Sequence, residues 1–442
     1  MTGEAVRARV GLVSALGLMY ATACGGPYGT EDFVPKVGPG AFVLLLFVTP
    51  WLFGLPTAFA TAELSARRSV AGGYYKWAQL YLGEFWGYQA GMWNLFMSFL
   101  DNALYPVLFA EALQHVSPDI TRFERWLAAV GFILVLTWLN YRGIRVAGGT
   151  ALALNAFLVA PLVWLVVAAA GQWRFNPLLP LSAPGTDLFG GLGACLALSI
   201  WLYSGYYEVS AAAEEIENPG RNIPLALLVL TPIVILSYAL PTLAGLAATG
   251  GWQAWVSGQF AAIGTAVGGP LLGHWLFLGS VASQAVIFLA YLVWWSRLVW
   301  AMAANHHLPG AFAKLHPRYG TPHRVLLVYA LAYSLIAALP FEKLLVADVW
   351  LTAVFCVLLQ ASLIRARKAE GPPPRGFRVP GGLAGVWTNA TVPTLTCVLM
   401  LVLTARENFV LGTSVVLGAP LLYLMRRAWG GTPPARPVAE AG

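Results

Sequence analysis

The chain of 442 residues is 58% hydrophobic and only 10% charged, whereas a soluble domain carries about a quarter charged residues. This composition excludes an ordinary soluble protein and indicates an integral membrane protein. The formal net charge of +7 does not indicate nucleic-acid binding, because the basic residues gather in loops on one side of the predicted spans.

Hydrophobic runs long enough to cross a bilayer follow one another along the chain. A spanning helix needs about 20 apolar residues, and about twelve runs meet this length. The first is too long for a signal-peptide core and lacks a small-residue cleavage site, so it is expected to remain as a helix. The predicted spans are 10–36, 40–66, 84–114, 124–141, 144–171, 188–216, 223–248, 271–304, 323–340, 343–365, 384–405 and 408–426.

These runs predict one all-α transmembrane domain over 1–442, with a disordered tail at 428–442. If the N-terminus is cytoplasmic, roughly 20 of the 26 basic residues fall on the cytoplasmic side, as the positive-inside rule requires. We therefore expect a multi-pass protein of the cell membrane with both termini in the cytoplasm.

Two predicted spans contain residues that interrupt a helix. The first contains 24–29 (CGGPYG) and the sixth contains 203–207 (YSGYY). Backbone left unpaired at bilayer depth is tolerated only where it lines a cavity or is buried in protein. Interrupted helices five spans apart indicate an inverted-repeat transporter with repeats at about 10–171 and 188–365 and extra helices at 384–426. The alternative is that the glycines only allow close helix packing.

Further motifs, in consistent order over nearly the whole chain, resemble the amino acid–polyamine–organocation (APC) superfamily. They are the first broken helix, 62–64 (AEL), 72–77 (GGYYKW), 214–219 (EEIENP) and stretches within 296–322. The resemblance implies a LeuT-like fold of five plus five helices, with helices 1 and 6 discontinuous, that works by alternating access.

Two segments point to particular branches of that superfamily. Residues 25–32 (GGPYGTED) and 101–109 (DNALYPVLF) resemble the polyamine-uptake branch. The sixth helix is mixed, because 203–205 (YSG) resembles amino-acid transporters whereas Glu208 stands where the polyamine branch carries an acid. Substrate is therefore not fixed by the resemblance.

The chemistry of the broken helices leaves the same two possibilities. Free amides around 26–30 are suited to a carboxylate, and free carbonyls near 203–205 to an ammonium group. However, Pro27 has no N–H to donate, and Glu31 would repel an anion. Glu31 could alternatively cap the helix that follows it.

Acidic residues within the spans favour a cationic substrate. Asp101 lies midway along the third span with Tyr105 four residues later on the same face, and Glu208 directly follows the second break. An acid at bilayer depth is costly unless it is paired or solvated, so it is a candidate site residue. Together with Glu31 these acids would make the cavity net negative, which favours amines. Structural hydrogen bonding is the alternative role for each.

Three sets of candidate residues follow. The predicted substrate-binding residues are Cys24, Gly25, Gly26, Tyr28, Gly29, Asp101, Tyr105, Trp201, Tyr203, Ser204, Gly205, Tyr207 and Glu208. The candidates for proton coupling are Glu208, Asp101 and Glu31. The candidates for an inner gate, with a solvated rim as the alternative, are Glu63, Glu214, Glu215 and Arg297.

The sequence thus predicts a secondary active transporter of amino acids or polyamines, with proton-coupled uptake of a cationic amine as the first hypothesis. The alternative is an L-type-like exchanger or symporter of neutral amino acids. A channel or an intramembrane enzyme is disfavoured, because neither a pore ring nor a catalytic set is visible. The expected partners are the solute, H⁺ and the lipid bilayer. No cofactor is expected, and the spacing of cysteines and histidines predicts no metal site.

Overall fold

The computed structural model describes residues 9–117, 119–185, 188–338 and 341–428. Helices make up the described chain, with one isolated bridge between Val10 and Ile216. The tail predicted at 428–442 lies outside the described residues except for its first position.

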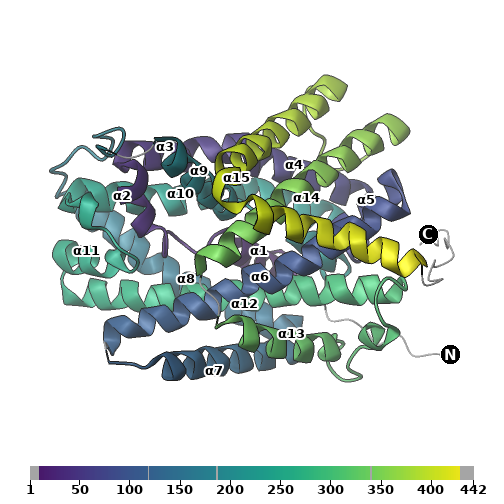
Figure 1. Ribbon diagram of the computed structural model, residues 1–442, viewed down its shortest axis with the longest axis horizontal. Coiled ribbons are helices and arrows are strands. Elements are labelled where there is room, and N and C mark those ends of the chain that lie inside the picture. The colour runs from purple at the N-terminus through teal and green to yellow at the C-terminus, as the bar shows by residue number, and fades with distance from the viewer. Residues whose placement is uncertain (1–8, 118, 186–187, 339–340, 429–442) are drawn as a thin grey trace.

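The long helices agree closely with the predicted spans and lie roughly side by side along the longest dimension of the molecule (Figure 1). In the first half of the chain they are α1 (Leu12–Ala23), α3 (Pro39–Thr49), α4 (Leu55–Arg67), α6 (Glu84–Val116), α7 (Arg122–Tyr141) and α8 (Ile144–Ala170). In the second half they are α9 (Leu188–Leu202), α10 (Pro219–Thr249), α12 (Pro270–Ala304), α13 (His323–Ile336), α14 (Phe341–Glu370) and α15 (Gly382–Ala428).

Shorter helices connect these elements, and two of them were not predicted. α5 (Gly73–Leu82) and α11 (Gln259–Gly268) lie between long helices, where the sequence suggested simple connections. Neither is long enough to span a bilayer, so their hydrophobic residues gave no signal of their own. The remaining short elements are η1 (Glu31–Phe33), α2 (Val34–Val37), the π-helical η2 (Pro50–Gly54) that joins α3 to α4, η3 (Glu208–Glu215), η4 (Trp252–Ala254) and η5 (Gly310–Ala313).

Proline and glycine fix several helix starts. α3 and α12 begin at Pro39 and Pro270, each directly after a glycine with positive φ: Gly38 at 99° and Gly269 at 84°. Proline suits the first helical position because its missing N–H is one that the helix would leave unpaired. Glycine adopts the positive φ without a Cβ clash. The chain therefore turns sharply before each of these helices.

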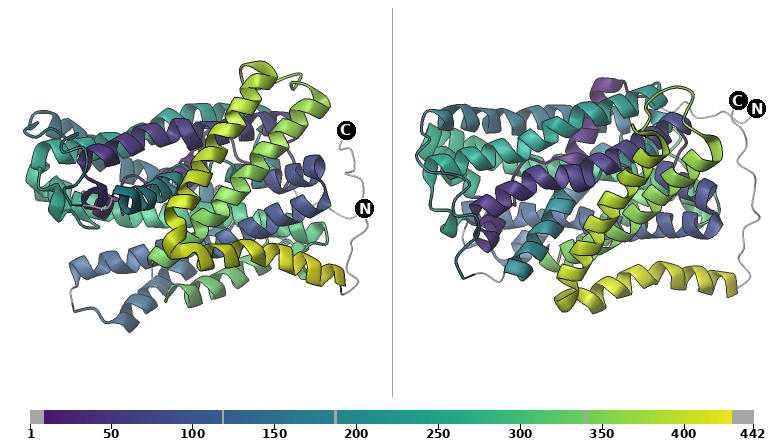
Figure 2. Two further views of the ribbon diagram at one scale, coloured as in Figure 1. Left: turned by 45° about the horizontal axis from the view of Figure 1, so that its top comes forward. Right: turned by 90° about the horizontal axis from the view of Figure 1, so that it is seen from above.

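α15 differs from prediction because it is a single helix where two spans were expected. It runs without interruption from Gly382 to Ala428. The ribbon changes direction along its length, so that one arm lies beside α14 and the other follows a different course (Figure 2). A bend of this kind allows a helix of 47 residues to cross a bilayer twice, since one crossing needs only about 20.

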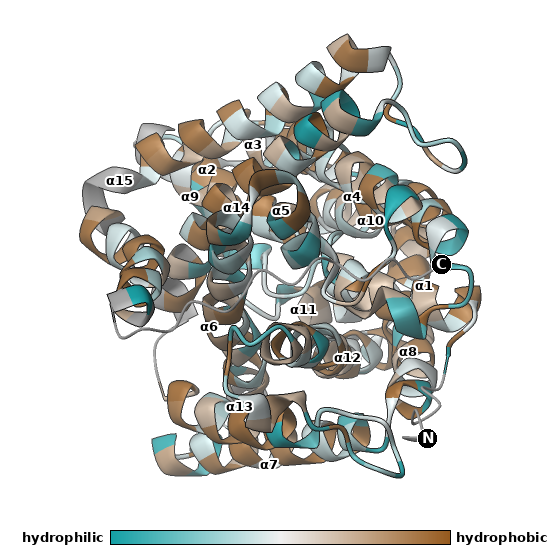
Figure 3. Cartoon of the chain, turned by 90° about the vertical axis from the view of Figure 1, so that its right-hand side faces the viewer, coloured by the Kyte–Doolittle hydropathy of each residue, from teal (hydrophilic) through white to brown (hydrophobic). Residues whose placement is uncertain are grey.

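Seven described helices are long and apolar enough to cross a membrane, and four shorter apolar helices accompany them. Large apolar side chains are exposed on outer helices, among them Trp138 on α7 and Leu331 and Leu335 on α13. α7 and α13 lie together at one edge of the bundle, with hydrophobic residues along them (Figure 3). Such a surface is suited to contact with lipid. The protein is a multi-pass membrane protein.

α6 is a central helix of the bundle and carries more polar side chains than a lipid-facing helix would. It contacts α5, α7, α12, α13, α14 and α15. Its polar residues Gln89, Asn94, Asp101 and Asn102 are all buried. Protein surrounds α6 and takes the place of lipid, so polar side chains are tolerated there.

Candidate functional site

The two predicted interruptions are present. α1 ends at Ala23, Cys24 is extended (φ −161°, ψ 116°), and helical structure resumes only at Glu31. α9 ends at Leu202, and η3 starts at Glu208. The residues of both interruptions are buried apart from the half-buried Gly29. We refer to residues 24–30 and 203–207 as the two breaks.

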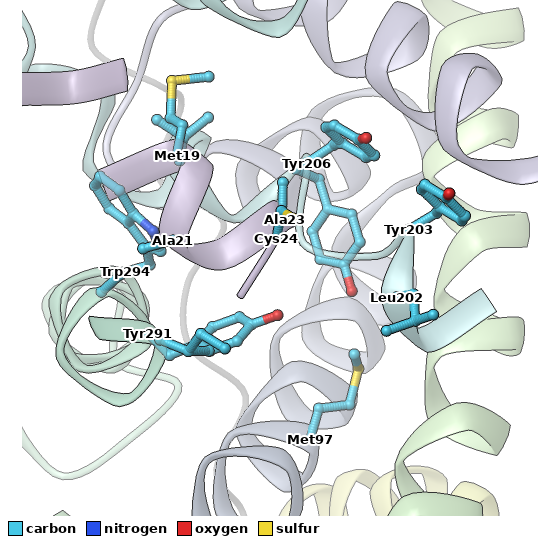
Figure 4. Close-up of a cluster of buried hydrophobic side chains, with 14 of the residues drawn as sticks. Met19, Ala21, Ala23, Cys24, Met97, Leu202, Tyr203, Tyr206, Tyr291 and Trp294 are labelled. Atoms are coloured by element: carbon cyan, nitrogen blue, oxygen red, sulfur yellow. The ribbon is translucent and has the colours of Figure 1, made fainter. Parts of the chain in front are cut away.

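The second break lies against the last turn of α1, next to the first break, in the centre of the bundle. Gly205 has a φ of 82°, and a Cβ at this position would lie 2.4 Å from the carbonyl oxygen of Thr22. Only glycine permits the backbone at Gly205 to approach the backbone of Thr22 so closely. Figure 4 draws Cys24, at the end of α1, in one cluster of buried side chains with Tyr203 and Tyr206 of the second break and Tyr291 of α12.

α12 holds the first break through two hydrogen bonds. The hydroxyl of Ser283 donates to the carbonyl of Gly25 at 2.5 Å, and that of Tyr291 donates to the carbonyl of Thr22 at 3.3 Å. These contacts satisfy carbonyls that a continuous helix would have paired internally. These hydrogen bonds therefore stabilise the non-helical conformation of the first break.

Several backbone N–H groups of the breaks remain free. Among hydrogen bonds between described residues, the amides of Gly25, Gly205 and Tyr206 donate to no acceptor. Buried backbone donors are almost always paired. The conformation of the breaks thus leaves these three donors without an acceptor among the described residues.

Asp101 of α6 faces the second break. Its Oδ1 accepts hydrogen bonds from Trp201 Nε1 at 2.8 Å and from the hydroxyl of Tyr105 at 3.2 Å. The carboxylate is buried. The two predicted aromatic residues and the predicted acid therefore form one group.

Glu208 lies at the start of η3, at the opposite side of that break. Its Oε2 accepts a hydrogen bond from the hydroxyl of Tyr74 at 3.1 Å. The rings of Tyr74 and Tyr207 pack edge to face at 5.4 Å, and Phe355 of α14 contacts both, at 5.1 and 4.5 Å between centroids. Neither Tyr74 nor Phe355 was predicted as a site residue.

A third buried acid, Asp348 of α14, was also missed. It is 2% exposed, and it lies within electrostatic range of Asp101 and Glu208. The predicted span 343–365 placed it only five residues from the membrane surface, where a carboxylate can reach water. The signal that could have found it is the one used for Asp101, an acid inside an apolar run.

No basic side chain balances these three carboxylates. Across the described ranges, no lysine, arginine or histidine forms an ion pair with Asp101, Glu208 or Asp348. Buried charges in proteins are normally paired. The centre of the bundle is therefore acidic and suited to a cation.

Stacked aromatic rings lie beside the acids. Tyr105 lies between Trp201 and Tyr291, with centroids 6.3 and 6.0 Å away and planes within 20° of parallel. Tyr291 stacks in turn on Trp295 at 4.2 Å. Faces of such rings attract ammonium groups.

Other predicted site residues use their polar groups to hold the breaks in place. The hydroxyls of Tyr28 and Tyr203 donate to the carbonyls of Leu158 and Leu46. Ser204 donates to the carbonyl of Trp201 one turn earlier. These three side chains position the backbone.

Around the first break, Glu31 and Cys24 make similar local contacts. Glu31 Oε2 accepts the Gly29 amide at 2.7 Å. The amide of Gly26 lies 3.3 Å from the sulfur of Cys24.

The gate candidates fall into two groups near α5. Arg297 of α12 donates from Nε and an Nη to the two oxygens of Glu215, at 2.9 and 3.1 Å, and both side chains are buried. Glu214 accepts the amide of Ala71. The pair is thus a buried bidentate contact and not a solvated rim.

Glu63 belongs to a separate cluster. Its carboxylate accepts hydrogen bonds from Arg67 of its own helix, from Arg367 of α14 and from the amide of Val379 at 2.7 Å. The cluster ties α4 to α14 and to the segment that follows it. Glu63 is thus not part of the Glu215–Arg297 pair.

Comparison with known proteins identifies the family. A model of the amino acid permease family matches residues 10–425. The chain belongs to this family, within the APC superfamily. It is therefore a transporter and not an enzyme.

Relatives of this permease occur in plants and bacteria. The polyamine transporter PUT1 of Oryza sativa subsp. japonica is 30% identical over 427 residues, which are 95% of this chain and 80% of the relative. The polyamine transporter RMV1 of Arabidopsis thaliana is 31% identical over 382 residues, 86% of this chain and 77% of the relative. The uncharacterized transporter Rv1999c of Mycobacterium tuberculosis is 26% identical over 377 residues, covering 84% and 83%.

Proposed function

We propose that this permease takes up a cationic amine, in first place a polyamine, by proton-coupled alternating access. The observation that carries the proposal is the set of three buried carboxylates, Asp101, Glu208 and Asp348, with no basic partner among the described residues. Uncompensated buried charge is costly, and a cationic solute would remove that cost.

The surroundings of the carboxylates also favour an amine over a neutral amino acid. A zwitterion brings its own carboxylate, which three acids would repel. An amine gains hydrogen bonds to the acids and lies beside the aromatic rings of Tyr105, Trp201 and Tyr291. The plant relatives named as polyamine transporters support the same choice.

The positions of the breaks support a LeuT-like inverted repeat. The breaks lie in corresponding helices of the repeats predicted at 10–171 and 188–365, and the family is one in which this architecture is expected. We assign the end of the bundle that carries α5, Arg67 and Arg367 to the cytoplasm of the cell, because most basic residues lie at the ends of helices on that side. Both termini are then cytoplasmic.

Coupling to protons is proposed through Glu208 and Asp101, with Glu31 as a further candidate. α8 carries no lysine, and its buried Asn155 donates to the carbonyl of Gly17 at 2.6 Å, so that it serves to join α8 to α1. No lysine from α8 thus stands in for a coupling ion. One of these carboxylates would take up a proton while another binds the ammonium group, so that both cations move inward together.

Uptake into proteoliposomes tests the proposal. Labelled putrescine and spermidine should accumulate in the vesicles when the outside is made more acidic than the inside, so that protons flow inward. Collapse of this proton gradient should abolish accumulation. Glu208→Gln should lower uptake at least about tenfold, because one charge-assisted hydrogen bond contributes roughly 1.5–3 kcal/mol.

The matched control is Glu370→Gln, which makes the same change at a partly exposed carboxylate near Arg67 and Arg68. It should transport like the wild type, since exposed ion pairs contribute little. Competition by spermidine, putrescine, arginine and leucine then ranks the substrates. Competition by leucine without competition by spermidine would show that the protein transports neutral amino acids instead.

A further inference from the structure

Asp348 is the least satisfied of the buried acids. Neither oxygen accepts a hydrogen bond or an ion pair from any described residue, and Oδ1 is fully enclosed. By contrast, Asp101 has two donors and Glu208 has one. A buried carboxylate without partners has no structural role that would offset its cost.

The face of α14 that carries Asp348 is directed toward the breaks. Phe355 lies seven residues later, two turns along the same face of the helix. Its ring contacts Tyr207 and Tyr74, the residues that flank and bind Glu208. α14 also packs along α6, the helix that carries Asp101 and Tyr105.

The carboxylates are therefore spread along the bundle. Seven residues correspond to about 10 Å along the axis of a helix. Phe355 lies at the level of Glu208, so Asp348 lies about two turns away from that level, on the side of Tyr105. One ammonium group cannot contact carboxylates at both levels, whereas a solute with two ammonium groups can.

We propose that Asp348 binds a second ammonium group of the solute, and so makes the permease select diamines and polyamines over monoamines. This inference rests on the proposed function, since it assumes that an amine is the cargo. Glu208 and the rings of Tyr74 and Tyr207 hold one ammonium group. Asp348 holds the other, beside Tyr105 and Tyr291.

The test compares two ligands that differ by one amine. The affinities of 1,4-diaminobutane and 1-aminobutane are measured by isothermal titration calorimetry on the purified full-length protein. The wild type should bind the diamine at least about tenfold more tightly, as expected for an added charge-assisted hydrogen bond. Equal affinities would overturn the inference even if no variant could be prepared.

Asp348→Asn isolates the residue, because the amide keeps the size of the carboxylate and removes its charge. We expect the diamine to lose at least about tenfold in affinity, while the affinity for the monoamine stays the same. Asp32→Asn is the matched control, since Asp32 pairs with Lys36 in an exposed position outside this group. It should keep the preference of the wild type.

The outcomes separate the two proposals. A wild type that prefers the diamine, with the preference retained in Asp348→Asn, would overturn the role of Asp348 and leave amine transport in place. A wild type that binds neither amine and binds leucine would overturn the proposed function and, with it, this inference.

Discussion

The buried pair of Arg297 and Glu215 gives a sharp prediction for the closure of the α5 end. The guanidinium forms two hydrogen bonds to the carboxylate, and the side chains are 5% and 8% exposed. Removing one member of such a pair leaves a buried charge and costs about 3–5 kcal/mol. If the pair forms only while this end is closed, Arg297→Gln shifts the equilibrium toward the open state by the same amount. A shift of about 3 kcal/mol is more than a hundredfold.

Alkylation of a native cysteine can measure this shift. Cys24 lies at the first break and is 1% exposed, and all four cysteines are free and buried. We expect a water-soluble maleimide to modify Cys24 much faster in Arg297→Gln than in the wild type, as measured by peptide mass spectrometry. Cys195, whose sulfur contacts the carbonyl of Phe33, should remain unmodified in both.

Two results would decide whether the pair of Arg297 and Glu215 keeps the α5 end closed. The exchanged pair Glu215→Arg with Arg297→Glu should restore slow modification of Cys24, because the opposite charges meet again. Unchanged modification in Arg297→Gln, in a protein with an unchanged elution profile, would refute the view that this pair keeps the end closed. Reaction of all four cysteines would indicate unfolding instead.

Two further substitutions test the contacts that shape the bundle. Gly205→Ala should abolish uptake, because its Cβ would lie 2.4 Å from the Thr22 carbonyl oxygen. The control Gly149→Ala should transport normally, since no atom lies within 4 Å of its Cβ. Equal uptake by the two variants would mean that transport does not need this close contact between Gly205 and α1. Glu63→Gln should lower the apparent melting temperature in detergent. The substitution leaves Arg367 buried without its charged partner, at a cost of about 3–5 kcal/mol. An unchanged melting temperature would contradict this account of the cluster.

Much of the helical architecture follows from hydrophobicity and helix-breaking residues. The spans and both breaks were predicted because long apolar runs are rare outside membranes and because glycine and proline interrupt helices at 24–29 and 203–207. α5, α11 and the continuity of α15 were not predicted. Short helices outside the bilayer leave no long apolar run, and a bend within a helix leaves no clear mark in a sequence whose two arms are both apolar.

The site could be predicted only where a residue carried its own signal. Asp101 and Glu208 stood out as acids inside apolar runs. Tyr74 and Phe355 carried no such signal, because a tyrosine in a connecting segment and a phenylalanine in a span are ordinary. Their roles arise because α5 packs against η3 and because the Phe355 ring of α14 contacts Tyr74 and Tyr207, which depends on the tertiary structure.

The contacts of α12 have a consequence for how motion spreads through this permease. Ser283 and Tyr291 attach this helix to α1, and Arg297 attaches it to η3. All three side chains lie on α12, so neither interrupted helix can tilt independently without losing a bond to it. Substitutions on the face of α12 directed away from the breaks should therefore alter the turnover rate, because they change how readily α12 moves. The affinity for the solute should stay the same.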